Sequence, residues 1–304
     1  MNPILLQSMA EAIEESSLPG NWAAFDLAFF SREKQLREYQ QAALRNARNV
    51  LWKYYEDFAD YHPQEPPTTN AQRKAQLWQW YRLNGLDESL VRFNMRRLNQ
   101  RIAHMLRERY DLEHDSYKPF INRMGFWMAT GSGKTLVIVK LIEMLWTLIR
   151  RQEIPPHPIL FLTHRDDLLD QIQAHVEEFN AARTGFRIIL HDLRKYDQIR
   201  YLQPFLFSET EAHIFCYRSD NLSDEQKDKI VDFRNYEHEG QWYVLLDEAH
   251  KGDREDSKRQ HIYSMLSRNG FLFNFSATFT DPRDIATTVY NFNLAEYLAQ
   301  GYGK

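Results

Sequence analysis

The stretch Met128–Thr135, with the sequence MATGSGKT, decides the fold class because of what stands on either side of it. A short apolar run, Phe126–Ala129, leads into it, and apolar residues at helical spacing follow from Leu136 to Leu145. Glycines let backbone N–H groups surround an anion, and the N-terminus of a helix adds positive potential. The sequence therefore predicts a strand, a phosphate-binding loop and a helix in direct succession.

The side chains of this stretch suit a nucleoside triphosphate bound together with Mg²⁺. In such loops the lysine, here Lys134, contacts the β- and γ-phosphates, and the hydroxyl of Thr135 ligates the metal ion. Met128 stands where the pattern usually has its first glycine, at the end of the strand, where an apolar side chain can face the core. The alternative is an ordinary Gly-Ser turn before a core helix. The expected phosphate-binding residues are Thr130, Gly131, Ser132, Gly133, Lys134 and Thr135.

A second apolar run, Tyr243–Leu246, predicts a buried parallel strand that ends in Asp247-Glu248-Ala249-His250. Parallel sheets bind their ligands beyond the carboxyl ends of their strands. We expect Asp247 to hold Mg²⁺, and Glu248 to orient and deprotonate an attacking water molecule. The alternative for this Asp-Glu pair alone is a solvated loop, and the phosphate-binding loop upstream disfavours it.

Together, MATGSGKT and DEAH resemble the superfamily 2 helicases and translocases, the DEAD/DEAH-type ATPases. The wording FWMATGSGKT is most similar to the helicase (R or Res) subunits of type III restriction-like systems. The resemblance covers roughly residues 36–300. It implies a first, RecA-like motor domain of an ATP-dependent DNA helicase or translocase that serves restriction or defence. It also gives His250 a catalytic role as a bridge between the nucleotide and the nucleic acid.

The resemblance extends to two segments near the nucleotide. Leu36–Gln40 resembles the glutamine motif, in which Gln40 would hydrogen-bond the adenine edge and select ATP over GTP. Ser276-Ala277-Thr278 resembles the motif that couples hydrolysis to movement, through Ser276 and Thr278. Without the resemblance, Gln40 is equally well explained as a solvated residue of a helix, and the tripeptide as a strand end.

Two more segments resemble the family's nucleic-acid contacts. Ile159–Arg165, followed by Leu168, Leu169 and Gln171, resembles the strand, loop and helix that grip a nucleic-acid backbone through Thr163, His164 and Arg165. Ile214–Ser219 stands where a second backbone contact is expected, through Tyr217 and Arg218. Hydroxyls and basic side chains are the groups that make such contacts. The alternative for Arg165 is a solvated charge after a core strand.

Composition sets broad limits on the 304-residue chain. Hydrophobic residues make up 43% and aromatic residues 14%, which is enough for a sizeable core. The net charge of -4 gives no overall basic field, although a local groove is sufficient to bind a nucleic-acid backbone. A single cysteine, Cys216, excludes an internal disulfide and fits a reducing cytoplasm. No signal-peptide pattern stands at the start, and Lys140 and Glu143 interrupt the longest apolar stretch, so we expect no membrane attachment.

The spacing of apolar runs predicts an α/β fold. Helical patterns lie between most of the runs, which favours right-handed βαβ units around a mainly parallel sheet flanked by helices, as in a RecA-like P-loop NTPase domain. The proline-rich segment 155–158 is expected to end the helix after the phosphate-binding loop and to precede the next strand. The runs lie near residues 124–129, 159–163, 187–190, 213–217, 242–246 and 271–275.

A helical insertion is expected before the phosphate-binding loop. The proposed division is residues 1–50, an N-terminal helical segment with the glutamine-type motif; 51–120, the insertion; and 121–304, the first motor domain. In the insertion, one helix is expected to end before the loop 63–69, a second to span Ala71–Leu83, and a third to run from Asp87 through Met105. Arginines of this third helix either form a solvated face or contact phosphates or a partner subunit: Arg92, Arg96, Arg97 and Arg101.

The resemblance also implies partners. A superfamily 2 motor needs a second RecA-like domain, in cis or in trans, and about twenty-five residues after Thr278 are too few for one. Modification or nuclease subunits are further expected partners, with DNA favoured over RNA. Two alternatives stay open: an RNA helicase fragment, and an ATP-gated, non-catalytic nucleic-acid-binding module.

Overall fold

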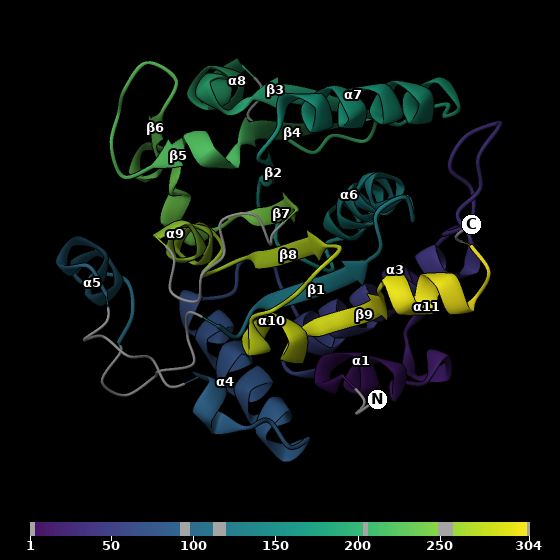
Figure 1. Ribbon diagram of the computed structural model, residues 1–304, viewed down its shortest axis with the longest axis horizontal. Coiled ribbons are helices and arrows are strands. Elements are labelled where there is room, and N and C mark those ends of the chain that lie inside the picture. Colours follow the sequence, from purple (N-terminus) through teal and green to yellow (C-terminus); the bar gives the residue numbers. More distant parts are fainter. Residues whose placement is uncertain (1–3, 92–97, 112–119, 203–205, 249–257, 303–304) are drawn as a thin grey trace.

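The computed structural model describes residues 4–91, 98–111, 120–202, 206–248 and 258–302 (Figure 1). Within these ranges, seven strands form one parallel sheet, in the order β3-β4-β2-β7-β8-β1-β9. A second sheet pairs β5 with β6. The strands are β1 Arg123–Met128, β2 Ile159–Thr163, β3 Arg187–Asp192, β4 Glu211–Arg218, β5 Leu222–Ser223, β6 Val231–Asp232, β7 Tyr243–Asp247, β8 Phe271–Ser276 and β9 Thr288–Phe292.

Helices cover both faces of the large sheet (Figure 1). Successive residues of a strand face opposite sides, so β2 contributes Ile159 and Phe161 to one core and Leu160 and Leu162 to the other. Helices α1, α3, α6 and α7 close the first core, and α5, α8 and α9 close the second. The α-helices are α1 Leu5–Glu11, α2 Gly20–Ala23, α3 Glu38–Trp52, α4 Pro67–Leu83, α5 Gln100–Arg107, α6 Lys134–Arg150, α7 Asp166–Ala181, α8 Tyr196–Leu202, α9 Lys258–Leu266, α10 Pro282–Ala286 and α11 Leu294–Ala299.

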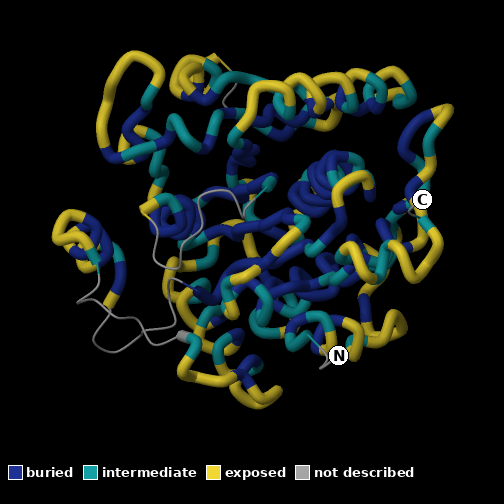
Figure 2. Tube along the Cα trace, viewed as in Figure 1, coloured by how far each residue is buried: buried dark blue, intermediate teal, exposed yellow. Residues whose placement is uncertain are grey.

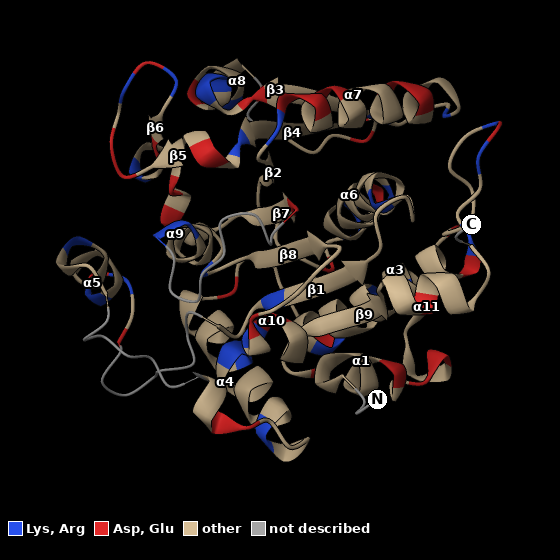
Figure 3. Cartoon of the chain, in the orientation of Figure 1, with Lys and Arg blue, Asp and Glu red and all other residues tan. Residues whose placement is uncertain are grey.

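The central strands are the most deeply buried part of the chain (Figure 2). Every residue of β2, β7 and β8 is buried, which explains why these strands have mostly apolar sequences instead of an alternation of apolar and polar residues. The predicted α/β fold with a mainly parallel sheet flanked by helices is therefore confirmed. Charged side chains of both signs are interspersed over the surrounding helices and loops (Figure 3), in keeping with the small net charge.

Strand β9 at one edge of the sheet was not predicted. It pairs with β1, and the N-terminal helices cover its outer side. The Gln7 side chain accepts a hydrogen bond from the backbone N–H of Asn291 at 2.9 Å, and the Asn46 amide donates to the Val289 carbonyl at 2.9 Å. These contacts satisfy backbone groups that an exposed edge strand leaves open. Residues after Ser276 thus complete this sheet through α10, β9 and α11.

The helical insertion differs from its prediction in the third helix. The second helix begins at Pro67, slightly earlier than expected, and ends at Leu83 as predicted. The third is not continuous, because Asn99 has a non-helical backbone and caps a new helix, α5, by accepting a hydrogen bond from the Arg101 N–H. A short 3-10 helix covers residues 88–91. Arg92, Arg96 and Arg97 lie outside the described residues.

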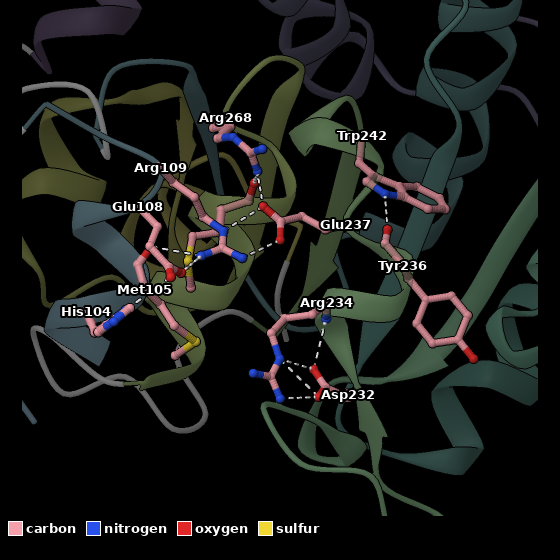
Figure 4. Close-up of polar contacts among 11 residues, drawn as sticks. His104, Met105, Glu108, Arg109, Asp232, Arg234, Tyr236, Glu237, Trp242 and Arg268 are labelled. Carbon is pink, nitrogen blue, oxygen red and sulfur yellow. Dashed lines mark hydrogen bonds and ion pairs between the residues drawn. The ribbon is translucent and has the colours of Figure 1, made fainter. Parts of the chain in front are cut away.

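The insertion is joined to the sheet domain by an ion-pair cluster beside α5 (Figure 4). Two nitrogens of the Arg109 guanidinium donate to the two carboxylate oxygens of Glu237, each at 2.6 Å. Arg268, shortly after the end of α9, also pairs with Glu237. Arg101 pairs with the carboxylate of Asp224 at 2.7 Å. In the part of the chain that the structure describes, no helix is long and apolar enough to cross a membrane.

Candidate nucleotide-binding site

The phosphate-binding loop connects the end of β1 to the start of α6, as the sequence predicts. Gly131 and Gly133 have φ angles of 80° and 77°, in the left-handed region that glycine adopts without steric cost. At Gly133 a side chain would also collide, since an added Cβ would lie 2.5 Å from Gln40 Nε2. The loop conformation therefore depends on both glycines.

Helix α3 packs against the phosphate-binding loop through Tyr39 and Gln40. The Tyr39 hydroxyl and the Gln40 amide both donate to the carbonyl of Ser132, at 2.8 and 2.9 Å. Gln40 Oε1 accepts a hydrogen bond from the Arg37 N–H at 2.8 Å, and only 3% of Gln40 is exposed. The Tyr39 ring stacks on Phe292, the last residue of β9. The structure thus places Gln40 against the phosphate-binding loop, where its amide holds the backbone.

Lys134 and Ser132 carry the polar atoms that an anion would contact. Lys134 Nζ lies 3.4 Å from the carbonyl oxygens of Met128 and Ala129, and burial lowers its pKa. Ser132 Oγ is buried and has no hydrogen-bond partner among the described residues. A buried hydroxyl without a partner is costly, so the site is suited to a polar ligand at this position.

Asp247 and Glu248 lie on the same sheet edge as the phosphate-binding loop. The strands β7 and β1 are parallel and only β8 separates them. Burial raises the pKa of Asp247 to about 6, and the charge of Lys134 opposes this rise. In turn, both carboxylates raise the pKa of Lys134. The strand order and these mutual effects are consistent in bringing the lysine and the two acids to one edge of the sheet. His250 lies outside the described residues.

Glu248 has an unusual backbone conformation. Its φ angle is 56°, a region that costs a residue with a side chain of order 1–3 kcal/mol. Its N–H donates to Asp247 Oδ1 at 2.9 Å, and its Oε2 lies 3.2 Å from His164 Nε2. Such strain persists where surrounding contacts fix the residue, and it is concentrated at functional sites.

The oxygen atoms of Thr135 and Asp247 fit a magnesium ion better than a transition metal. Thr135, in the first turn of α6, is 8% exposed, and Asp247, the last residue of β7, is 4% exposed. Among the described residues no group of three His, Cys, Asp or Glu could hold a metal ion. Mg²⁺ typically takes only one or two protein ligands and completes its shell with phosphate and water oxygens. The residues present therefore fit Mg²⁺ bound with a triphosphate.

The two segments expected to contact nucleic acid are neighbours, since β2 pairs with β4 and Thr163 lies opposite Arg218. The side chains of Tyr217 and Arg218 are engaged within the protein. Tyr217 donates its hydroxyl proton to the Lys229 carbonyl at 2.6 Å, and Arg218 pairs with Asp166 and Asp220. A cavity of about 240 Å³ opens beside them; its lining includes Arg194, Lys229, Tyr217 and Arg218.

His164 and Arg165 point to different neighbours. His164 reaches Glu248, as described above, whereas the exposed Arg165 pairs with Asp167. Thr163 is fully buried at the end of β2, and its hydroxyl has no hydrogen-bond partner in the described part of the chain. The loop that was predicted to contact a nucleic-acid backbone therefore lies beside Asp247 and Glu248, through the contact of His164 with Glu248.

Ser276 and Thr278 form a closed turn at the end of β8, between the loop and the acidic pair. Ser276 Oγ donates to the Thr278 carbonyl at 2.7 Å and accepts from the Thr278 N–H at 3.1 Å. The Trp127 indole N–H donates to the Ala277 carbonyl at 3.0 Å and ties the turn to β1. The turn is therefore positioned beside both halves of the site.

Sequence reasoning missed two contacts of the site. Tyr39 was not recognised as a support of the loop, although it stands directly before Gln40. The hydrogen bond from Thr135 Oγ1 to Gln171 Oε1, at 3.3 Å, was also missed. Both join residues far apart in the chain, so no local pattern reveals them.

A parallel sheet with a glycine-rich loop after one strand and paired carboxylates two strands away defines a RecA-like domain of the helicase type. The comparison with protein families agrees with this class. The chain belongs to the family described as type III restriction enzyme, res subunit, which matches residues 33–281. It is thus a helicase-like domain of the restriction type. A comparison with curated proteins finds no match.

Proposed function

We propose that this chain is the ATP-binding and ATP-hydrolysing motor domain of a DNA helicase or translocase in a restriction or defence system. The observation that carries the proposal is the position of Lys134 and Asp247 at one edge of the sheet. Only β8 separates β1, which leads into the loop with Lys134, from β7, which ends in Asp247, and the charge of each group affects the pKa of the other. A lysine at a phosphate-binding loop that faces a buried carboxylate is the arrangement that binds a metal-chelated triphosphate.

Each residue of the site has a distinct role in this proposal. The loop from Thr130 to Gly133 offers backbone N–H groups to the phosphates, and Lys134 neutralises the β- and γ-phosphates. Thr135 and Asp247 would hold Mg²⁺, which supplies positive charge where negative charge develops during phosphoryl transfer. Lys134 also favours the ionised form of Asp247, because its charge opposes the effect of burial on the Asp247 pKa.

Glu248 is the proposed general base. Its carboxylate stands next to Asp247 at the mouth of the site, where it would orient a water molecule and accept its proton. His250 would connect this acid to the nucleic acid, as the family resemblance implies. Ser276 and Thr278 lie between the two halves of the site, which supports their proposed role in coupling hydrolysis to movement.

The nucleic-acid side of the proposal rests on the family. Thr163, His164 and Arg165 after β2, and Tyr217 and Arg218 on β4, would contact the backbone; Arg165 and Arg218 would then exchange their present carboxylate partners for phosphates. DNA is favoured over RNA because the family is one of restriction enzymes. A second RecA-like domain and modification or nuclease subunits are the proposed partners, and a cytoplasmic location is supported by the single cysteine.

The proposed division of the chain is residues 1–50, 51–120 and 121–304. The first segment packs on the edge strand and holds the loop through Gln40, which supports its assignment to the nucleotide site. The insertion attaches through Arg109 and Arg101, away from the loop. This supports a role for the insertion outside ATP binding.

Binding of a fluorescent ATP analogue in the presence of Mg²⁺ tests the proposal. Lys134→Ala should weaken binding by at least about tenfold, since a charge-assisted contact contributes of order 1.5–3 kcal/mol. Glu248→Gln should bind the analogue as the wild type does but lose single-turnover hydrolysis. Lys227→Ala, which removes an exposed surface charge, is the control. Equal affinity of the Lys134→Ala variant and the wild type would refute the proposed function.

A further inference from the structure

The segment that follows β2 returns to the nucleotide site at two points. His164, in the loop before α7, places Nε2 3.2 Å from Glu248 Oε2. Gln171, on α7, accepts a hydrogen bond at 3.3 Å from the hydroxyl of Thr135, the proposed metal ligand. One continuous stretch of chain therefore contacts both the proposed general base and the proposed metal-binding hydroxyl.

The contact with Gln171 determines how the Thr135 hydroxyl is oriented. A hydroxyl has one proton and two acceptor lone pairs. Because the proton of Thr135 is directed at Gln171 Oε1, its lone pairs are directed elsewhere and stay available to a cation. Partners of this kind, which bond to a ligand but not to the metal, typically change metal affinity by about 10–100-fold when they are removed.

The imidazole of His164 lies beside the Glu248 carboxylate, with 3.2 Å between Nε2 and Oε2. The Glu248 backbone has a left-handed conformation, and its N–H donates a hydrogen bond to the Asp247 carboxylate. The His164 imidazole contacts the carboxylate at the end of the Glu248 side chain. The side chains of His164 and Glu248 are 16% and 22% exposed. Solvent screens a partly buried ion pair much less than a surface pair, so a protonated imidazole at this position would hold the carboxylate in place.

A surface pair elsewhere in the chain shows the contrast. His104 and Glu108, on and just after α5, are also 3.2 Å apart, but their side chains are 72% and 54% exposed. Such solvated pairs contribute little. The His164–Glu248 contact differs by its burial and by its position at the nucleotide site, not by its length.

We propose that His164 and Gln171 are positioning residues of the ATP site: Gln171 orients the Thr135 hydroxyl toward Mg²⁺, and His164 holds the Glu248 carboxylate. The inference rests on the proposed function. It gives the segment after β2 a second task besides contact with nucleic acid. Neither residue touches the phosphates in this assignment.

Magnesium titration of ATP-analogue binding tests the Gln171 part. Gln171→Ala should require at least about tenfold more Mg²⁺ for half-maximal binding, with unchanged binding of the analogue in EDTA. Gln171→Glu, which keeps an acceptor oxygen, should restore the wild-type requirement. Gln173→Ala, on the same helix and paired only with the exposed Glu177 in the described contacts, is the control.

Two results would overturn the Gln171 assignment. One is a Gln171→Ala titration that coincides with that of the Gln173→Ala control. The other is a Gln171→Glu variant that is as impaired as Gln171→Ala, since the acceptor oxygen would then be irrelevant. A wild-type protein that fails to bind the analogue at any Mg²⁺ concentration would instead refute the proposed function itself.

Single-turnover kinetics test the His164 part. His164→Ala should lower the hydrolysis rate constant by about tenfold or more without changing the ATP concentration for half-maximal rate. His164→Gln, which retains a donor, should recover part of the rate, and His104→Ala should match the wild type. Unchanged rates in His164→Ala, or an equal loss in His164→Gln and His164→Ala, would overturn the assignment. A wild type that binds but never hydrolyses ATP would contradict the proposed role of Glu248, and with it the role of His164.

Discussion

The Lys134 ammonium and the Asp247 carboxylate act on each other's ionisation across the carboxyl edge of the sheet, although more than a hundred residues separate them in the chain. Burial disfavours the charged form of each group, and each charge partly offsets the effect of burial on the other. The site therefore holds two desolvated, opposite charges before any ligand enters. This arrangement is costly for folding and useful for binding.

Replacing the Asp247 carboxylate should raise the stability of the fold and abolish the binding of Mg²⁺ with nucleotide. Asp247→Asn keeps the shape of the side chain and removes a charge whose pKa is raised to about 6 by burial. We expect the melting temperature to rise by about 2–4 °C, because a carboxyl pKa raised above its unfolded value means that folding disfavours the ionised form at neutral pH even beside Lys134, while Mg²⁺-dependent stabilisation by an ATP analogue disappears. Differential scanning fluorimetry with and without ligand measures both effects. Asp228→Asn, at an exposed position, should change neither; a lower melting temperature for Asp247→Asn would argue against a costly buried charge.

Gln40→Ala tests whether this residue supports the loop or selects the base. Its amide bonds to the Ser132 carbonyl, so its removal should weaken ATP and GTP analogues alike, by about fivefold for one buried hydrogen bond. Gln41→Ala removes a neighbouring amide that bonds to the Leu36 carbonyl and is the control. A loss of ATP affinity with GTP affinity unchanged would favour the adenine contact that the glutamine motif implies.

Acidic pH should weaken the ion pairs of Glu237 with Arg109 and Arg268, which join the insertion to the sheet domain. Burial raises the pKa of Glu237, but Arg109 and Arg268 lower it more, so its pKa lies below the ordinary value of 4.5. A lowered carboxyl pKa adds stability above the unfolded-state pKa, and this stability is lost as the pH falls through the folded-state pKa. Glu237→Gln should therefore be less stable to urea than the wild type near neutral pH, and the difference should shrink below about pH 4.5.

The control for this pH dependence is Glu33→Gln, at an exposed position. It should leave the unfolding free energy unchanged at every pH. The difference in unfolding free energy between Glu237→Gln and the wild type could also stay constant from neutral to acidic pH. That result would show that the charge of the Glu237 carboxylate does not stabilise its contacts with Arg109 and Arg268.

Turnover by the 304-residue chain alone should be slow. In the resembled motors an arginine from a second RecA-like domain completes the site, and such a residue contributes about a thousandfold or more to the rate. Here the residues after Ser276 complete the first sheet through α10, β9 and α11. Phosphate release measured with and without DNA should therefore show binding with weak steady-state hydrolysis. Rapid, DNA-stimulated turnover would contradict this expectation.

The sequence was sufficient to predict the strands of the sheet centre. Runs such as Ile159–Thr163 and Tyr243–Leu246 are apolar throughout because both faces are covered, and this signal is local. Strand β9 escaped prediction because its sequence, TVYNF, mixes apolar and polar residues. It is a strand because its backbone pairs with β1, and Gln7 and Asn46, from distant helices, bond to its outer edge.

The motifs supply the candidate residues of the site, but they do not reveal the contacts that these residues make. The glutamine motif identifies Gln40, yet the bond from its amide to Ser132 depends on how α3 packs beneath the loop. The left-handed backbone of Glu248 has no signal in its side chain, since glutamate rarely adopts this conformation. The break at Asn99 was missed because the apolar spacing continues across it, and a cap outweighs that periodicity.

The most direct test of the account is a crystal structure of the chain with a non-hydrolysable ATP analogue and Mn²⁺ in place of Mg²⁺. Anomalous diffraction locates the manganese ion directly, because manganese scatters anomalously and the protein's light atoms scarcely do. The account predicts an anomalous peak between the Thr135 hydroxyl and the Asp247 carboxylate, with the terminal phosphate at Lys134. A nucleotide bound away from Lys134, or a manganese ion remote from Asp247, would contradict the proposed ATP site.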